Sequence, residues 1–176
     1  MLPFILIALA MPAAEQNDLK MIKLFDAAGN AQYFGALAQL PPLGQDQAEV
    51  RVWVQGALIG GVSGWVIAGS EIQVYSNIKD VDGVIQVEEG QLRLEKTIRS
   101  EEMASEFLVT FSQFANLDEK TIVCDVRDGS SLSIDGMVAG SHFSIFAGNP
   151  GFCDKPGARE IADAYARLVE VGKNTD

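Results

Sequence analysis

One histidine in the chain has neighbours of the types used in acid–base or nucleophilic chemistry. His142 is the only histidine, and Ser141 and Ser144 lie within two positions of it. Asp125 is expected on an outward face of a nearby strand, so a serine–histidine–aspartate arrangement is one interpretation. The alternation of the surrounding strand places His142 away from the apolar face, as for an ordinary exposed histidine. A hydrolase using His142 is therefore an alternative prediction, and the sequence does not fix the geometry that it needs.

Carboxylates recur around one glycine in a pattern that partly matches a calcium-binding loop. Aligned on Gly83, the chain offers Asp80, Asp82 and Glu89 at the third, fifth and twelfth positions of such a loop. The first position holds Ile78, which cannot bind a cation, and the flanking residues have the composition of strands rather than helices. We therefore expect a β-hairpin turn with solvated acids, and keep weak calcium binding as an alternative.

Two cysteines, Cys124 and Cys153, are the only ones in the chain. Two cysteines in an exported chain are expected to pair. A loop of this length would stabilise the fold by roughly 3.6 kcal/mol through the lowered entropy of the unfolded chain. If the bond forms, the helix after Cys153 must begin beside the apolar face of the strand that carries Cys124, because bonded cysteines have nearby α-carbons. Two free thiols are the alternative.

Other chemistry-bearing patterns are weak. The acidic pairs Glu88-Glu89 and Glu101-Glu102 are adjacent residues, which do not face each other on a strand or a helix. Gly60-Gly61 and Gly64 match neither a dinucleotide-binding nor a phosphate-binding glycine loop. We therefore expect no cofactor and no catalytic residue from these segments.

The charge of the chain bears on its partners. Acidic residues number 24 against 13 basic ones, for a net charge of −11. Such a surface repels phosphate backbones and anionic lipid headgroups, so we expect no nucleic-acid partner. Hydrophobic residues make up 48% of the chain, as in an ordinary globular domain.

The first 14 residues are apolar and end in small side chains before an acidic segment begins at Glu15. This stretch is too short to span a bilayer of about 30 Å, and its pattern is typical of an export signal. Cleavage is expected after Ala10 or Ala14, leaving one disulfide-stapled domain over residues 15–176. The predicted location is the bacterial periplasm or the cell exterior, with a buried N-terminal helix as the alternative.

Residues 15–48 show no clear apolar pattern, and Gly29-Asn30 within them indicates a turn. After this segment, alternating apolar residues predict a series of strands. The alternation in residues 49–55 predicts a half-buried strand, and the Asp82-Gly83 pair predicts a hairpin turn. Two further Asp-Gly pairs, Asp128-Gly129 and Asp135-Gly136, predict a three-stranded meander at residues 120–147. The Gly-rich stretch 56–69 is expected to form two strands with Trp53 and Trp65 as cross-strand or surface aromatics, a membrane-inserting segment being the alternative.

In two segments, apolar residues are spaced as on one face of a helix. Residues 100–115 carry an aromatic stripe behind a serine suited to cap the helix, and the apolar face of residues 157–171 holds Ile161, Tyr165, Leu168 and Val169. Together these elements predict an α+β fold. It has a mainly antiparallel sheet of six to eight strands, on which the C-terminal helix packs. The preferred functional prediction is a non-enzymatic exported domain that binds a protein or a small ligand.

Overall fold

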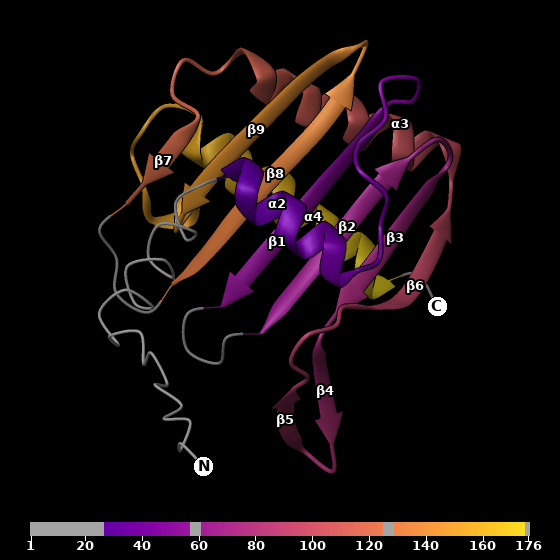
Figure 1. Ribbon diagram of the computed structural model, residues 1–176. Coiled ribbons are helices and arrows are strands. Elements are labelled where there is room, and N and C mark those ends of the chain that lie inside the picture. The colour runs from indigo at the N-terminus through magenta and orange to yellow at the C-terminus, as the bar shows by residue number, and fades with distance from the viewer. Residues whose placement is uncertain (1–26, 57–60, 125–128, 175–176) are drawn as a thin grey trace, which may run out of the picture.

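A seven-stranded β-sheet with helices on both faces organises the chain in the computed structural model (Figure 1). The structure describes residues 27–56, 61–124 and 129–174. These residues form the helices α2 (Ala27–Leu37), α3 (Glu101–Ser112) and α4 (Ala158–Asn174), and the short 3₁₀ helices η1 (Gln113–Asn116) and η2 (Pro150–Phe152). The strands are β1 (Glu49–Gly56), β2 (Val62–Ala68), β3 (Glu71–Ser76), β4 (Ile78–Val81), β5 (Val84–Val87), β6 (Arg93–Arg99), β7 (Thr121–Val123), β8 (Ser130–Val138) and β9 (Ser141–Gly148).

The strand order of the sheet is β6-β3-β2-β1-β8-β9-β7, and β4 and β5 form a separate two-stranded hairpin. Neighbouring strands are antiparallel except β7, which runs parallel to β9. The predicted α+β class, with a mainly antiparallel sheet and a C-terminal helix packed on it, is confirmed. The meander expected at residues 120–147 contains its antiparallel pair, β8 with β9. The remaining strand of the expected meander, β7, does not pair with β8. It lies on the other side of β9 and runs parallel to it, and parallel neighbours cannot be joined by a tight turn.

Helices α3 and α4 pack side by side on one face of the sheet, hereafter the α4 face (Figure 1). The predicted aromatic stripe of α3 is confirmed as core, with Phe107, Phe111 and Phe114 all buried. Ser100 caps α3 as expected, since its Oγ accepts a 3.3 Å hydrogen bond from the Met103 amide. Most of the apolar burial in the described chain therefore lies on this face.

Helix α2 crosses the opposite face of the sheet over β1, β8 and β9, hereafter the α2 face (Figure 1). Ala31, Phe34 and Ala38 pack there with Trp53. The turn expected at Gly29-Asn30 was wrong, because both residues lie within α2. Packing of the apolar side of α2 on the sheet overrides the poor helix propensity of glycine and asparagine.

Strand β1 is covered by helices on both of its faces, so its expected half-buried character was wrong. Val52 faces the α4 core while Arg51 and Trp53 are buried on the α2 face. Trp53 and Trp65 are likewise not surface residues, since they are 0% and 5% exposed and belong to the cores of opposite faces. The stretch 56–69 does contribute strands, β1 ending and β2 beginning within it.

Two Asp-Gly pairs behave differently in the structure. Asp82 and Gly83 both have positive φ and turn β4 into β5, as predicted. Asp135-Gly136 lies inside β8, and the chain turns instead at Ala139-Gly140. Gly136 is required by packing rather than by a turn, because a Cβ at this position would lie 2.5 Å from the Phe143 ring.

The first 14 residues, with the predicted signal segment and its cleavage sites, lie outside the described residues. So do Asp125 and Asp128. In the part of the chain that the structure describes, no helix combines the length and apolar character needed to cross a bilayer.

Candidate functional site

The predicted histidine lies in a polar cluster on the α2 face. His142 and Ser144 project from the same side of β9, and Asp135 faces Ser144 across the antiparallel pair with β8. Asp135 is 6% exposed, and its Oδ1 lies 2.8 Å from His142 Nε2. The same oxygen accepts a hydrogen bond from the Ser144 hydroxyl.

This cluster differs from the relay of a serine hydrolase. There, histidine stands between serine and aspartate and takes the proton of the serine hydroxyl. Here Asp135 stands between Ser144 and His142, so the Ser144 hydroxyl donates to a carboxylate. The contact with Asp135 can fix the orientation of His142, leaving Nδ1 as the free ring nitrogen. A hydrolase using His142 stays a prediction, and the bond from Ser144 to Asp135 does not provide the serine–histidine contact that a serine nucleophile needs.

The three carboxylates proposed for calcium lie on the β4–β5 hairpin and the turn after it. Asp80 Oδ1 accepts a 2.8 Å hydrogen bond from the Gly83 amide, which stabilises the hairpin turn. Among the residues described, no group of three or more histidine, cysteine or acidic side chains is placed to hold a metal ion. Calcium binding by Asp80, Asp82 and Glu89 remains a prediction that a calcium titration of the melting temperature tests.

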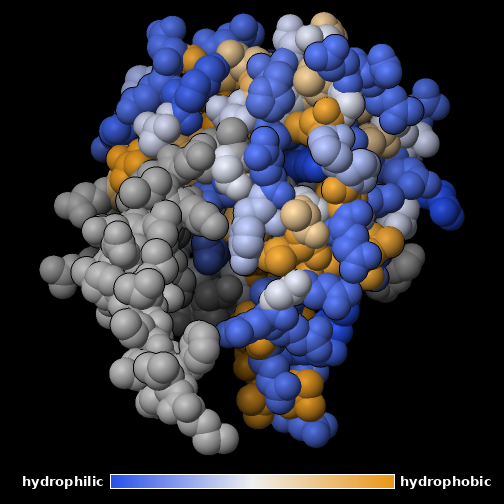
Figure 2. Space-filling model, viewed as in Figure 1, coloured by the Kyte–Doolittle hydropathy of each residue, from blue (hydrophilic) through white to orange (hydrophobic). Residues whose placement is uncertain are grey.

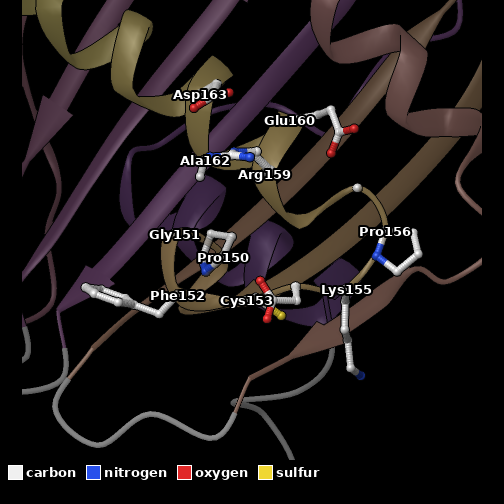
Figure 3. A pocket seen from close by; sticks show the side chains of 12 residues that line it. Pro150, Gly151, Phe152, Cys153, Lys155, Pro156, Arg159, Glu160, Ala162 and Asp163 are labelled. Atoms are coloured by element: carbon white, nitrogen blue, oxygen red, sulfur yellow. The ribbon is translucent and has the colours of Figure 1, made fainter.

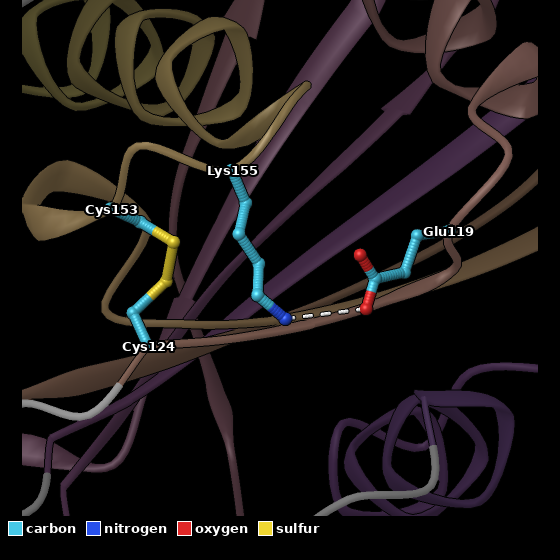
Figure 4. The surroundings of a disulfide bond; sticks show 4 residues. All are labelled: Glu119, Cys124, Cys153 and Lys155. Carbon is cyan, nitrogen blue, oxygen red and sulfur yellow. Dashed lines mark hydrogen bonds and ion pairs between the residues drawn. A yellow bond between two sulfur atoms is a disulfide. The ribbon is translucent and has the colours of Figure 1, made fainter.

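Cys124 and Cys153 are joined in the structure, with their α-carbons 5.6 Å apart (Figure 4). The bond connects the end of β7 to the segment between η2 and α4, and the 3.3 Å ion pair between Lys155 and Glu119 lies beside it. The C-terminal helix therefore begins next to the edge of the sheet, as the sequence predicted for a bonded pair.

A cavity of about 620 Å³ lies beside this disulfide, lined entirely by residues 150–163 (Figure 3). Its charged side chains have both signs, and Phe152 at its rim is 77% exposed. In Figure 3 the side chains of Phe152, Lys155 and Glu160 point away from one another rather than toward a common centre. These three side chains therefore do not converge on a common ligand position.

A second cavity, of about 410 Å³, lies between the C-terminal half of α4 and the α4 face of the sheet, hereafter the α4 cavity. Its walls are mostly apolar. The lining residues are Val54, Gly56, Gly61, Ser63, Trp65, Val74, Ile78, Tyr165, Val169, Gly172 and Lys173. Strands β1, β2 and β3 form one wall, the start of β4 adds Ile78, and α4 forms the other wall.

Two aromatic residues shape the α4 cavity. The rings of Trp65 and Tyr165 meet edge to face with their centroids 5.7 Å apart. Burial raises the pKa of the Tyr165 phenol above its usual value, so this group is neutral at physiological pH. The indole Nε1 of Trp65 is buried and finds no hydrogen-bond partner among the described residues, and a Cβ at Gly172 would lie 3.4 Å from it.

The electrostatics of the α4 cavity are simple. Lys173, on the last turn of α4, is the one charged residue among those that line it. Lys96 donates a 3.2 Å hydrogen bond to the Gly172 carbonyl, which satisfies an acceptor at the end of α4. The walls therefore offer apolar surface, with polar groups confined to a few positions.

Sequence reasoning did not find this cavity. Tyr165 and Val169 were correctly assigned to the apolar face of the C-terminal helix, but Trp65 was expected to be a cross-strand or surface aromatic. The available signal was the polar tips of Trp65 and Tyr165 on otherwise apolar faces, because a buried tryptophan or tyrosine usually finds a hydrogen-bond partner.

Comparison of the chain with models of known protein families finds no match, and comparison with functionally characterised proteins finds none either.

Proposed function

We propose that this protein is an exported, non-enzymatic domain that binds a small apolar ligand in the α4 cavity. The observation that carries the proposal is the apolar lining of this cavity, with the Trp65 and Tyr165 rings in its wall. Small-molecule sites are typically concave and mostly apolar, with volumes of about 300–1,000 Å³ and a few polar groups. The α4 cavity has these properties, and the hollow beside the disulfide lacks the apolar walls.

Hydrophobic burial is the driving force that we expect for this binding. Moving apolar surface out of water is favourable by roughly 25 cal/mol for each Å² buried. The cavity offers Val54, Val74 and Val169 as walls for such surface. A highly charged ligand is disfavoured, because the walls provide a single cation and no pair of convergent donors.

The disulfide supports the exported location. Disulfides persist mainly in oxidising compartments, and Cys124 and Cys153 are bonded in the structure. The apolar segment at residues 1–14 supports the same location through its export-signal pattern.

A dye titration tests the proposed function. N-phenyl-1-naphthylamine is uncharged, and its fluorescence rises in apolar surroundings, so we expect a saturable increase with the wild-type protein. Val169→Trp places an indole in the α4 cavity and should weaken dye binding at least about tenfold. The matched control is Val109→Trp, at a position on α3 that is 58% exposed and outside the cavity lining.

The outcomes are distinct. Selective loss in Val169→Trp supports the α4 cavity as the binding site. The absence of any saturable signal, or equal affinities in both variants and the wild type, contradicts the proposal.

A second candidate, a hydrolase using His142, draws support from the 2.8 Å contact between His142 Nε2 and Asp135 Oδ1. Such a contact resembles the way a carboxylate orients a general-base histidine. A screen of ester, amide and phosphoester substrates with wild type and His142→Ala tests it. Activity that persists in the variant, or that is absent from both proteins, contradicts this candidate.

A further inference from the structure

One face of the β4–β5 hairpin continues the wall of the α4 cavity. The register pairs Ile78 with Val87 and Asp80 with Ile85, and directly paired residues project from the same face of a two-stranded ribbon. Ile78, Val87, Ile85 and Asp80 therefore share one face, hereafter the Ile85 face, with Asp80 opposite Ile85 at its outer end. Because Ile78 also lines the α4 cavity, apolar surface runs from the cavity onto the hairpin.

The hairpin is held to the sheet by one buried residue at its base. Asn77 is 7% exposed, and its side-chain Oδ1 accepts a 2.7 Å hydrogen bond from the Val62 amide. Its backbone donates to the Val62 carbonyl at 3.1 Å and accepts from the Glu88 amide at 2.8 Å. Glu88 also pairs with Lys79 of the hairpin and with Arg93 at the start of β6. These bonds fix the direction in which the Ile85 face points relative to the cavity.

The outer part of the hairpin exposes large apolar side chains to solvent. Figure 1 shows the hairpin projecting from the end of the sheet, and Figure 2 shows hydrophobic residues on it among hydrophilic ones. Ile85 is 53% exposed on one face, and Val84 is 59% exposed on the other. Of these two, only Ile85 shares a face with the cavity-lining Ile78.

We infer that the ligand is a single extended alkyl or acyl chain, with its tail in the α4 cavity and the remainder along the Ile85 face. The inference rests on the function proposed above and deepens it. The surface that leaves the cavity is only two strands wide, or about 10 Å, and extends about 7 Å from Ile78 to Ile85. A flexible chain fits such a strip, whereas a stable protein partner usually buries a total of about 1,200 Å² or more.

The orientation of the chain follows from the chemistry of the two ends. The cavity end is apolar, so it takes the tail. The hairpin end carries Asp80, Asp82 and solvent-exposed backbone, so a polar headgroup stays hydrated there. Asp80 accepts the Gly83 hydrogen bond, which keeps its carboxylate at the tip of the hairpin.

Alkyl maltosides of six to twelve carbons, used below their micellar concentrations, test this inference because their headgroup is uncharged and constant. We measure their displacement of N-phenyl-1-naphthylamine from wild type, Ile85→Ser and Val84→Ser. In the wild type, affinity should rise with chain length. In Ile85→Ser, dodecyl maltoside should bind about tenfold more weakly, as expected when the burial of one isoleucine is lost, while hexyl maltoside is unaffected.

Val84→Ser is the matched control, since Val84 is the sequence neighbour of Ile85 with similar exposure on the opposite face. Equal losses in both variants, no loss in either, or an affinity independent of chain length would overturn the extended-chain inference while leaving dye binding, and thus the proposed function, intact. If neither the dye nor any maltoside binds the wild type, the proposed function itself fails, and the inference fails with it.

Discussion

The two faces of the sheet differ in what lies beside their buried polar groups. On the α2 face, buried charges have partners within the chain: Arg51 bonds Glu49 and the Pro41 carbonyl, and Asp135 bonds Ser144 and His142. On the α4 face, the buried indole N–H of Trp65 has no partner among the described residues and lies beside a cavity. Satisfied buried polar groups mainly specify a structure, whereas space beside an unsatisfied donor leaves room for a ligand. Trp53 Nε1 on the α2 face is also buried without a partner among the described residues, but the Trp53 ring packs against Phe34 and Tyr75 and does not line the α4 cavity. The cavity beside Trp65 is therefore the difference that motivates the proposed binding function.

The largest effect should come from truncating the apolar core on the α4 face. Ile134 is fully buried there, and Ile134→Ala should lower the free energy of unfolding by about 4 kcal/mol, in the upper part of the range for such cavities. Urea unfolding followed by circular dichroism measures it. If the free energy of unfolding falls by less than about 1 kcal/mol, the core must be able to close around the deleted atoms. The α4 face would then not be the more important of the two faces for stability.

The next largest effect should come from the disulfide, which fastens the α4 layer to the edge of the sheet. Replacing Cys124 and Cys153 together by serine should cost roughly 3.6 kcal/mol of unfolding free energy, because the unfolded chain regains the entropy of an open loop. Dithiothreitol should destabilise the wild type by a similar amount and leave the double variant unchanged. Equal sensitivity of both proteins to the reductant would contradict this account.

A smaller effect should come from the polar cluster on the α2 face. Asp135 is the chain neighbour of Ile134 and points to the opposite face, so the pair compares the two faces directly. Asp135→Ala should cost about 1–3 kcal/mol, since Ser144 and His142 lose their common acceptor but His142, with a side chain 49% exposed, can bind water instead. Asp135→Asn, which keeps an acceptor, should recover part of the loss. A cost for Asp135→Ala equal to that for Ile134→Ala would mean that the cluster is as important to the fold as the apolar core.

Local signals allowed much of the fold to be predicted. The hairpin at Asp82-Gly83, the cap at Ser100 and the aromatic stripe of α3 depend on residues close in sequence, and all three were predicted correctly. Asp135-Gly136 carries the same local signal as Asp82-Gly83 but lies within a strand, because Ser144 and Phe143 of the neighbouring strand pack against it. The helix at Gly29-Asn30 depends in the same way on packing against Trp53, which no local pattern encodes.

The candidate site was harder to predict than the fold. The cysteine pairing could be predicted because the chain has only two cysteines. The α4 cavity instead brings Trp65 of β2 together with Tyr165 and Gly172 of α4, and its existence depends on how closely one helix approaches the sheet. The position of His142 on an outward face was predicted, but its partner Asp135 was taken for a turn residue, so the cluster was missed.

The smallest effect should come at alkaline pH from two tyrosines, the buried Tyr75 on the α2 face and the partly buried Tyr165 on the α4 face. Burial raises the pKa of Tyr165 on the α4 face, and burial also raises that of Tyr75 on the α2 face, where the charge of Arg51 partly opposes the shift. A raised pKa means that the folded protein keeps a proton that the unfolded chain loses. Stability should therefore be constant below about pH 10 and fall as pH rises beyond it. Tyr165→Phe should flatten this fall more than Tyr75→Phe, because burial alone raises the pKa of Tyr165, whereas at Tyr75 the charge of Arg51 lowers the pKa against the raising effects of burial and Glu49. Melting temperatures between pH 8 and 11 measure the two slopes, and a larger flattening in Tyr75→Phe would show that the polar surroundings on the α2 face do not compensate its buried groups.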